Sequence, residues 1–142
     1  MIRIALGICL ALSAAAPAPA QTLNLMKGID APHYDAQRTT WGPTSDIVNM
    51  FQDTLVALDW DGKTALPYLA KSWTISPDGK LYTFKLRDDV SFCSGKKMTA
   101  EDVIFTFKRL KSPEIKGPYA WRAGNIKELR APDPGTAAAC CG

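Results

Sequence analysis

Three side chains near the N-terminus have types and spacing that could bind a metal ion. Asp30, His33 and Asp35 form a D-x-x-H-x-D cluster, and carboxylate and imidazole groups both bind divalent metals. His33 is also the only histidine, so a Ser-His-Asp triad would have to include it. The chain has no G-x-S-x-G elbow, and acidic residues beside one histidine are common in loops that bind no metal. We therefore expect no metal site, no catalytic residue and no cofactor.

The loop after the first predicted strand is an early candidate for ligand contact. α/β folds commonly bind ligands just beyond the carboxyl end of a strand. Residues 22–26 are predicted to form a strand, and residues 26–30 occupy that position. The candidate ligand-binding residues there are Lys27, Gly28 and, slightly later, Tyr34. Ordinary loop residues are the competing interpretation.

Tryptophan side chains offer flat surfaces on which a ligand could stack. Trp121 follows Pro118-Tyr119-Ala120 in a predicted loop, so it is the candidate for an exposed ligand-binding ring. Trp60 and Trp73 lie in strand-like segments, and we expect both in the core.

The first twenty residues have the layout of a secretory signal peptide. Arg3 is their only charge, residues 4–16 form a short apolar run, and small residues precede a cleavage point after Ala20. The run is thirteen residues long, short of the roughly 20 that a membrane-spanning helix needs. We expect cleavage after Ala20 and export to the periplasm, rather than a retained anchor.

The charge of residues 21–142 is close to neutral, with 16 basic and 14 acidic side chains. This balance suggests neither a nucleic acid nor an anionic membrane as partner. The basic groups at Lys96-Lys97 and at residues 108–111 are most simply solvated surface. Three cysteines follow residue 20, without metal-like spacing. Either Cys93 pairs with Cys140 or Cys141, or it is a lone buried thiol and the last two belong to a disordered tail.

Hydrophobic periodicity and turn residues predict a mixture of helices and strands. Thr99 is a good N-cap for the clearest helix, which has acidic residues in its first turn and basic ones in its last. Ser76-Pro77-Asp78-Gly79 predicts a hairpin turn. The predicted strands are 22–26, 55–60, 73–75, 81–86 and 126–129. A second predicted helix follows Pro43, and its buried face contains Ile47, Val48, Phe51 and Leu55. A third, short helix is predicted at 65–72.

Residues 135–142 depart from the pattern of the rest of the chain. A strand is expected after Asp133-Pro134, but Gly-Thr-Ala-Ala-Ala-Cys-Cys-Gly shows no alternation and little β-branching. We interpret this segment as a low-complexity, aberrant tail, such as a frameshift would produce.

Residues 66–110 carry a series of motifs that strongly resembles the bacterial extracellular solute-binding proteins of family 5, the oligopeptide-, dipeptide- and nickel-binding proteins. The motifs read P-x-L-A-x-S-W from Pro67, S-P-D-G from Ser76, Y-T-F-x-L-R from Tyr82, V-x-F from Val90 and, after Gly95, T-A-x-D-V from Thr99, here with Glu101 before Asp102. Weaker likeness extends upstream to residue 22, in residues 23–26, 29–33 and 53–56.

The resemblance implies an α/β chain with a partial periplasmic-binding-protein-like class II fold, comprising the start of the first lobe and most of an extra domain. It implies a signal peptide at 1–20, an N-terminal portion of a solute-binding domain at 21–134, and the tail at 135–142. The implied function is capture of a small solute, expected to be a short peptide, and its delivery to an inner-membrane ABC permease. The chain would be a monomer, not an enzyme, with residues 26–30 lining the cleft between the lobes.

Two other interpretations remain open. Family members are several times longer than this chain, so it could be a non-functional truncated or frameshifted remnant. The weaker alternative is a small secreted metal-dependent hydrolase that relies on His33.

Overall fold

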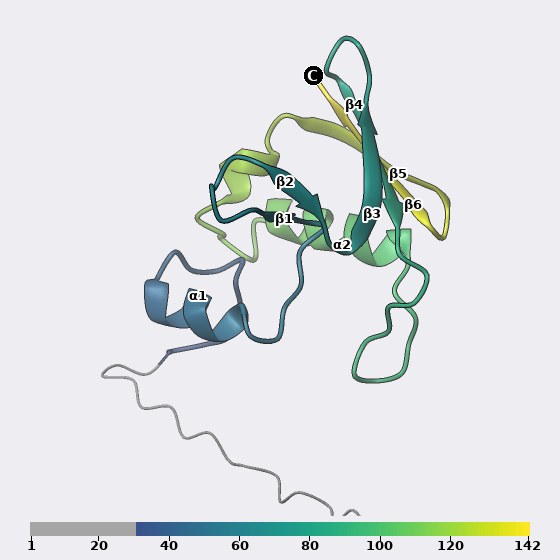
Figure 1. The fold of residues 1–142 in the computed structure, drawn as a ribbon. Coiled ribbons are helices and arrows are strands. Elements are labelled where there is room, and N and C mark those ends of the chain that lie inside the picture. The colour runs from purple at the N-terminus through teal and green to yellow at the C-terminus, as the bar shows by residue number, and fades with distance from the viewer. Residues whose placement is uncertain (1–30) are drawn as a thin grey trace, which may run out of the picture.

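A four-stranded antiparallel sheet forms the centre of the fold, and one long helix packs against one of its faces (Figure 1). The computed structural model describes residues 31–142, so the predicted signal peptide and the predicted strand at 22–26 lie outside the described residues. The sheet has the strand order β3-β4-β6-β5, and a separate two-stranded hairpin joins β1 and β2. The elements are α1 (Gly42–Val48), β1 (Val56–Leu58), β2 (Ala65–Pro67), β3 (Ala70–Ile75), β4 (Leu81–Leu86), α2 (Ala100–Lys111), the 3-10 helix η1 (Ala120–Ala123), β5 (Ile126–Asp133) and β6 (Thr136–Cys141).

The hairpin between β3 and β4 is confirmed where the sequence predicts it. The Ser76 N–H donates to the Leu81 carbonyl and the Gly79 N–H to the Ser76 carbonyl, and Gly79 has a φ of 70°. A residue with a side chain rarely adopts this left-handed backbone conformation, which explains why glycine occupies the position. The alternation of β4 is confirmed as well, because Leu86 and Phe84 face the helix while Lys85 is exposed.

The core lies between this sheet and α2. Ala70, Leu86 and Ala137 pack from the sheet against Ala100 and Val103 of the helix. The helix begins where Thr99 predicts it. The Asp102 carboxylate accepts hydrogen bonds from the Thr99 N–H at 2.9 Å and from its hydroxyl at 3.0 Å, which holds the first turn in place.

The end of the chain corrects the sequence interpretation most clearly. Residues 136–141, expected to form a low-complexity tail, make β6, which lies between β4 and β5 and pairs with both. Thr136 to Ala139 are all buried. Alanine forms strands poorly by itself, but a central strand gains hydrogen bonds along both edges, and its small side chains fit closely below the helix.

Two predicted helices also differ in the structure. Residues 65–72 form β2 and the start of β3 instead of a helix, because the segment pairs with β1 on one side and β4 on the other. α1 ends at Val48, so Phe51 lies beyond it and is 59% exposed instead of buried. Trp41 occupies the N-cap position and α1 includes Pro43, so the helix begins before Pro43 and not after it.

Two expectations about burial are wrong. Trp60 is 94% exposed at the tip of the β1–β2 hairpin and is not a core residue, whereas Trp73 in β3 is half-buried. Cys93 is a free thiol and exposed, and Cys140 and Cys141 are free and half-buried in β6, so neither predicted arrangement of the cysteines is present. Among residues 31–142, no helix is long and apolar enough to span a bilayer.

Candidate functional site

An apolar groove with a volume of about 380 Å³ lies beside α2. Its floor comes from the helix through Val103 and Phe107. Its walls come from Leu55 before β1, Leu69 before β3, and the Phe92 and Met98 segment that leads into the helix. The apolar side chains of the groove are incompletely covered, since Phe107 is half-buried and Phe92 is 47% exposed.

Carboxylates lie at the rim of this groove. Asp53 accepts a hydrogen bond from the Tyr68 hydroxyl at 3.1 Å, and this bond raises the pKa of Tyr68. Asp102 forms an ion pair with Lys96 at 2.6 Å, and the lysine is the main reason that the pKa of Asp102 is lowered. An apolar side chain could lie in the groove with a cationic group near Asp53, so the chemistry of the groove is that of binding.

The predicted ligand-binding residues are dispersed. Lys27 and Gly28 lie outside the described residues. Tyr34 is 54% exposed and meets Phe51 edge-on, with ring centroids 6.3 Å apart. The backbone carbonyl of Tyr34 accepts a hydrogen bond from the Gln52 side chain. Gln52 precedes Asp53, which lines the groove, so Tyr34 contacts the segment that enters the groove.

Trp121 belongs to a different part of the surface. It lies in η1 and is 73% exposed, so the expected exposed ring is present. The Arg122 guanidinium lies 5.4 Å from the centroid of the Trp121 ring and 4.4 Å from that of Tyr119. Tyr34 and Trp121 therefore belong to two separate clusters of side chains.

Asp30 lies outside the described residues, and the other two members of the D-x-x-H-x-D cluster, His33 and Asp35, have structural partners. Asp35 accepts two hydrogen bonds from Arg109 of α2, at 2.6 and 3.1 Å, and the His33 Nδ1 accepts from the Asp35 N–H at 3.3 Å. Arg109 is the main reason that the pKa of Asp35 is lowered. Within residues 31–142 no group of three His, Cys, Asp or Glu side chains is arranged to hold a metal ion.

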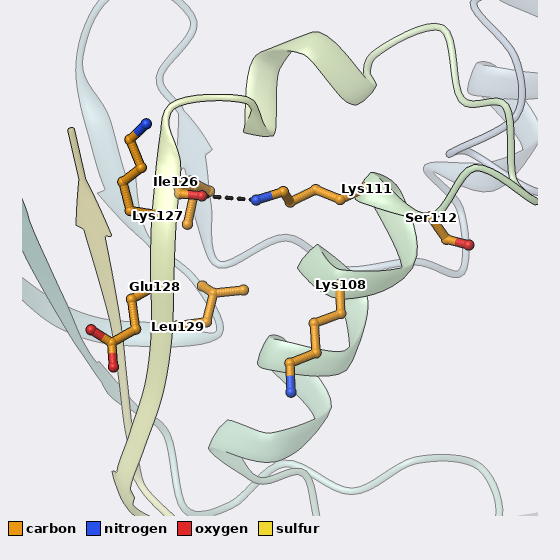
Figure 2. Close-up of a pocket in the computed structure, with 7 residues that line it drawn as sticks. All are labelled: Lys108, Lys111, Ser112, Ile126, Lys127, Glu128 and Leu129. Atoms are coloured by element: carbon orange, nitrogen blue, oxygen red, sulfur yellow. Dashed lines mark hydrogen bonds between the residues drawn. The ribbon is translucent and has the colours of Figure 1, made fainter.

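A second hollow of about 260 Å³ lies between the end of α2 and β5 (Figure 2). Lys108 and Lys111 reach from the helix toward the strand, and the Lys111 ammonium donates to the Ile126 carbonyl at 2.8 Å. Leu129 points toward the helix from β5, while Lys127 and Glu128 point away from it.

Sequence reasoning did not identify the apolar groove. Leu55, Val103 and Phe107 read as core positions of their elements, and only the packing shows that part of this surface is left uncovered. The one available signal was Phe92, a large apolar residue beside the turn Ser94-Gly95.

Comparison with known proteins gives a family for this structure. The profile of the bacterial extracellular solute-binding proteins, family 5 (middle), matches residues 64–137, just over half of the chain. The chain belongs to this family. The members of this family are solute-binding proteins and not enzymes.

Relatives within the family have been studied under several names. The periplasmic oligopeptide-binding protein OppA of Haemophilus influenzae is 34% identical over 100 residues, which are 70% of this chain and 18% of the relative. The nickel-binding periplasmic protein of Escherichia coli is 37% identical over 83 residues, 58% of this chain and 16% of the relative. The chain thus spans about a fifth of the length of these relatives.

Solved structures of similar proteins contain the same arrangement of elements. Peptide-bound OppA of Listeria monocytogenes superposes with a TM-score of 0.78 at 26% identity, covering 88% of this chain and 28% of that one. OppA of H. influenzae in complex with RPPGFSPFR superposes with a TM-score of 0.70 at 27% identity. The superposition covers 76% of this chain and 24% of that one. The fold is therefore a mixed α/β portion of a periplasmic binding protein.

Proposed function

We propose that this chain is the N-terminal portion of the substrate-binding component of a peptide-type ABC importer. It would be exported to the periplasm, lose residues 1–20 after Ala20, and act as a monomer that presents a short peptide to an inner-membrane permease. Residues 21–134 would contribute the start of the first lobe and most of the extra domain.

The observation that carries the proposal is the match of residues 64–137 to the family, together with the names of the relatives. Besides the oligopeptide-binding protein, a di/tripeptide-binding protein of Pseudomonas aeruginosa is 40% identical over 85 residues, 54% of this chain and 16% of the relative. The superposition on two peptide-bound structures supports the same ligand class.

The proposed mechanism is a shift between an open and a closed form, in which the peptide binds the closed form more tightly. No bond is made or broken. The contribution of this chain would come from Lys27, Gly28 and Tyr34 and, on a separate part of the surface, from Trp121. The apolar groove, with Asp53 at its rim, suits an apolar side chain that follows a peptide's ammonium group.

The competing function is that of a remnant without binding activity. The chain spans about a fifth of its relatives, and in a two-lobed binder many ligand contacts come from other parts of the protein. The third alternative, a hydrolase that uses His33, has the least support, because Asp35 is held by Arg109.

A thermal melt of residues 21–142 with and without pooled di- to pentapeptides tests the proposal. A ligand that binds only the folded form raises the melting temperature by mass action. At a free ligand concentration of ~100 times its Kd, the ligand adds about 2.7 kcal/mol to the free energy of unfolding. We expect a cooperative transition that rises with peptide, and a smaller rise in Trp121→Ser.

Trp60→Ser is the matched control, since Trp60 is also an exposed tryptophan but lies on the β1–β2 hairpin. A transition that is blind to peptide would favour the remnant and contradict the proposal for this chain. A response to Ni²⁺ but not to peptides would replace the peptide by a metal ligand. Peptide hydrolysis that is lost in His33→Ala would support the enzyme.

A further inference from the structure

Charge is unevenly distributed along the folded part of the chain. Residues 31–107 carry eight basic and ten acidic side chains, whereas residues 108–142 carry seven basic and three acidic ones. The nearly neutral total therefore combines an acidic part with a basic part. The basic part contains the end of α2, η1 and β5, and α2 packs against both of the other elements.

Five exposed cations gather at this end of the molecule. They are Lys108, Lys111, Lys116, Arg122 and Lys127, and we refer to them as the basic end. Lys108 and Lys111 line the hollow between α2 and β5 from the helix side. Lys127 lines it from β5, with its ammonium group pointing away from the helix (Figure 2). Arg122 belongs to η1, which packs against the same helix.

Neighbouring charges leave the basic end largely uncompensated. Arg109 forms an ion pair with Asp35 at 2.6 Å. Arg130 forms an ion pair with Glu128, to which it donates hydrogen bonds of 2.6 and 2.7 Å. Glu114 is then the remaining acidic residue between positions 108 and 130. The Lys111 ammonium donates to a neutral carbonyl, which leaves its positive charge unpaired.

A favourable interaction with the end of the helix accounts for part of this charge. Lys108 and Lys111 lie in the last turn of α2, where cations stabilise the negative end of the helix dipole. Lys116, Arg122 and Lys127 lie outside α2, so helix stability gives no reason for them. Their position beside the helix end is set by the tertiary structure.

An exposed tryptophan lies next to these cations. Trp121 is 73% exposed, and the guanidinium of Arg122 lies over its ring at 5.4 Å from the centroid. Tryptophan rings and basic side chains occur together where proteins contact the boundary between lipid headgroups and acyl chains. Basic residues near an anionic leaflet each add about 1 kcal/mol of attraction, which corresponds to about fivefold in affinity.

We propose that the basic end binds the surface of an anionic phospholipid bilayer, with Trp121 at the headgroup level. The hollow between α2 and β5 measures about 260 Å³, which is small for a segment of a protein partner. The cations are instead spread over three segments, so separate headgroups can reach them individually. Such contact would hold the protein close to a membrane without insertion. It does not depend on the identity of the transported ligand.

Vesicle co-sedimentation of the processed protein tests this inference. With vesicles containing about 30% phosphatidylglycerol we expect binding that disappears at about 0.5 M NaCl, because salt screens exposed charges. With pure phosphatidylcholine we expect none. The triple variant Lys108→Gln/Lys111→Gln/Lys127→Gln should bind about a hundredfold more weakly, at about fivefold per charge.

The matched control is Lys63→Gln/Lys71→Gln/Lys80→Gln, which removes the same number of exposed charges from the β1–β2 hairpin, β3 and the β3–β4 turn. Equal loss in the two triple variants, or no binding by the wild type, would overturn the proposal. Binding to immobilised poly-glutamate without binding to anionic vesicles would also overturn it, in favour of an acidic protein partner. Lys127→Glu alone, at an exposed strand position, provides the second variant if the triple does not fold; unchanged binding there contradicts the proposal.

Discussion

Arg109 connects the segment before α1 to the helix α2. Its guanidinium bonds the Asp35 carboxylate twice and also donates to the Gln37 side-chain oxygen at 2.6 Å. The two side chains are only 33% and 24% exposed, so water weakens this pair less than it weakens a fully exposed one. The pair therefore fixes the position of Tyr34, the candidate contact next to Asp35.

Asp35→Asn should lower the free energy of unfolding by about 1 kcal/mol at pH 7. The pKa of Asp35 is lowered below its ordinary value of 3.8, chiefly by the hydrogen bond from Arg109. A carboxyl whose pKa is lower in the folded state stabilises the fold above its unfolded pKa. The difference between wild type and variant in urea unfolding should thus be complete above the ordinary carboxyl pKa and disappear as the pH falls through the lowered pKa of the folded state.

The matched control for this prediction is Asp89→Asn. Arg87 and Asp89 form a similar two-residue ion pair, but their side chains are 46% and 63% exposed, so we expect a smaller change than in Asp35→Asn. Equal effects of the two variants would mean that the Asp35 pair has no special role in joining the segment before α1 to α2.

At the scale of elements, β6 decides the integrity of the sheet. It separates β4 from β5 and pairs with both, so neither could form its present ladder without it. Ala137 is 4% exposed and packs with Leu86 and Val103 below α2. A larger residue at this position would push the helix away from the sheet, which explains the small side chain of Ala137.

Ala137→Asp should unfold the sheet. The new carboxylate would be buried without a partner, which costs several kcal/mol and approaches the whole stability of a small domain. Circular dichroism should show loss of the cooperative transition. Ala65→Asp is the control, because Ala65 is exposed in β2, and it should melt like the wild type. A folded Ala137→Asp protein would mean that β6 is not a central strand.

For the molecule as a whole, large apolar side chains remain on the surface. Leu58, Trp60, Leu66 and Tyr68 form an exposed group on the β1–β2 hairpin, and Phe105 is 66% exposed on the outer side of α2. Exposed apolar groups of this kind mark surfaces that bind other molecules. Within the proposed function, they are surfaces that the rest of a full-length binding protein could cover.

The native chain should therefore bind the dye ANS, and Trp60→Ser should bind it measurably less. Because Trp60 is 94% exposed, the free energy of unfolding should change by less than about 0.5 kcal/mol in this variant. Trp73→Ser is the comparison, since Trp73 is half-buried in β3 and its loss should cost more than about 1 kcal/mol. A strongly destabilised Trp60→Ser protein would place Trp60 in the core after all.

Local signals in the sequence determined the β3–β4 hairpin, the start of α2 at Thr99, the alternation of β4 and the family resemblance. Each depends on residues close together in the chain, such as Gly79 in its turn and Asp102 three positions after Thr99. Such signals act through backbone conformation and short-range hydrogen bonds, which a sequence shows directly.

Only the tertiary structure decided that residues 136–141 form the central strand β6 and that Trp60 is exposed. It also decided that Asp35 pairs with Arg109 and that the cations of the basic end lie together. Asp35 and Arg109 are 74 residues apart, and β6 is stabilised by two neighbouring strands and not by its own alanines. The basic end combines α2, η1 and β5, while the acidic residues lie mostly earlier in the chain. Burial, pairing and local charge depend on which distant segments meet, and neither periodicity nor net charge contains that information.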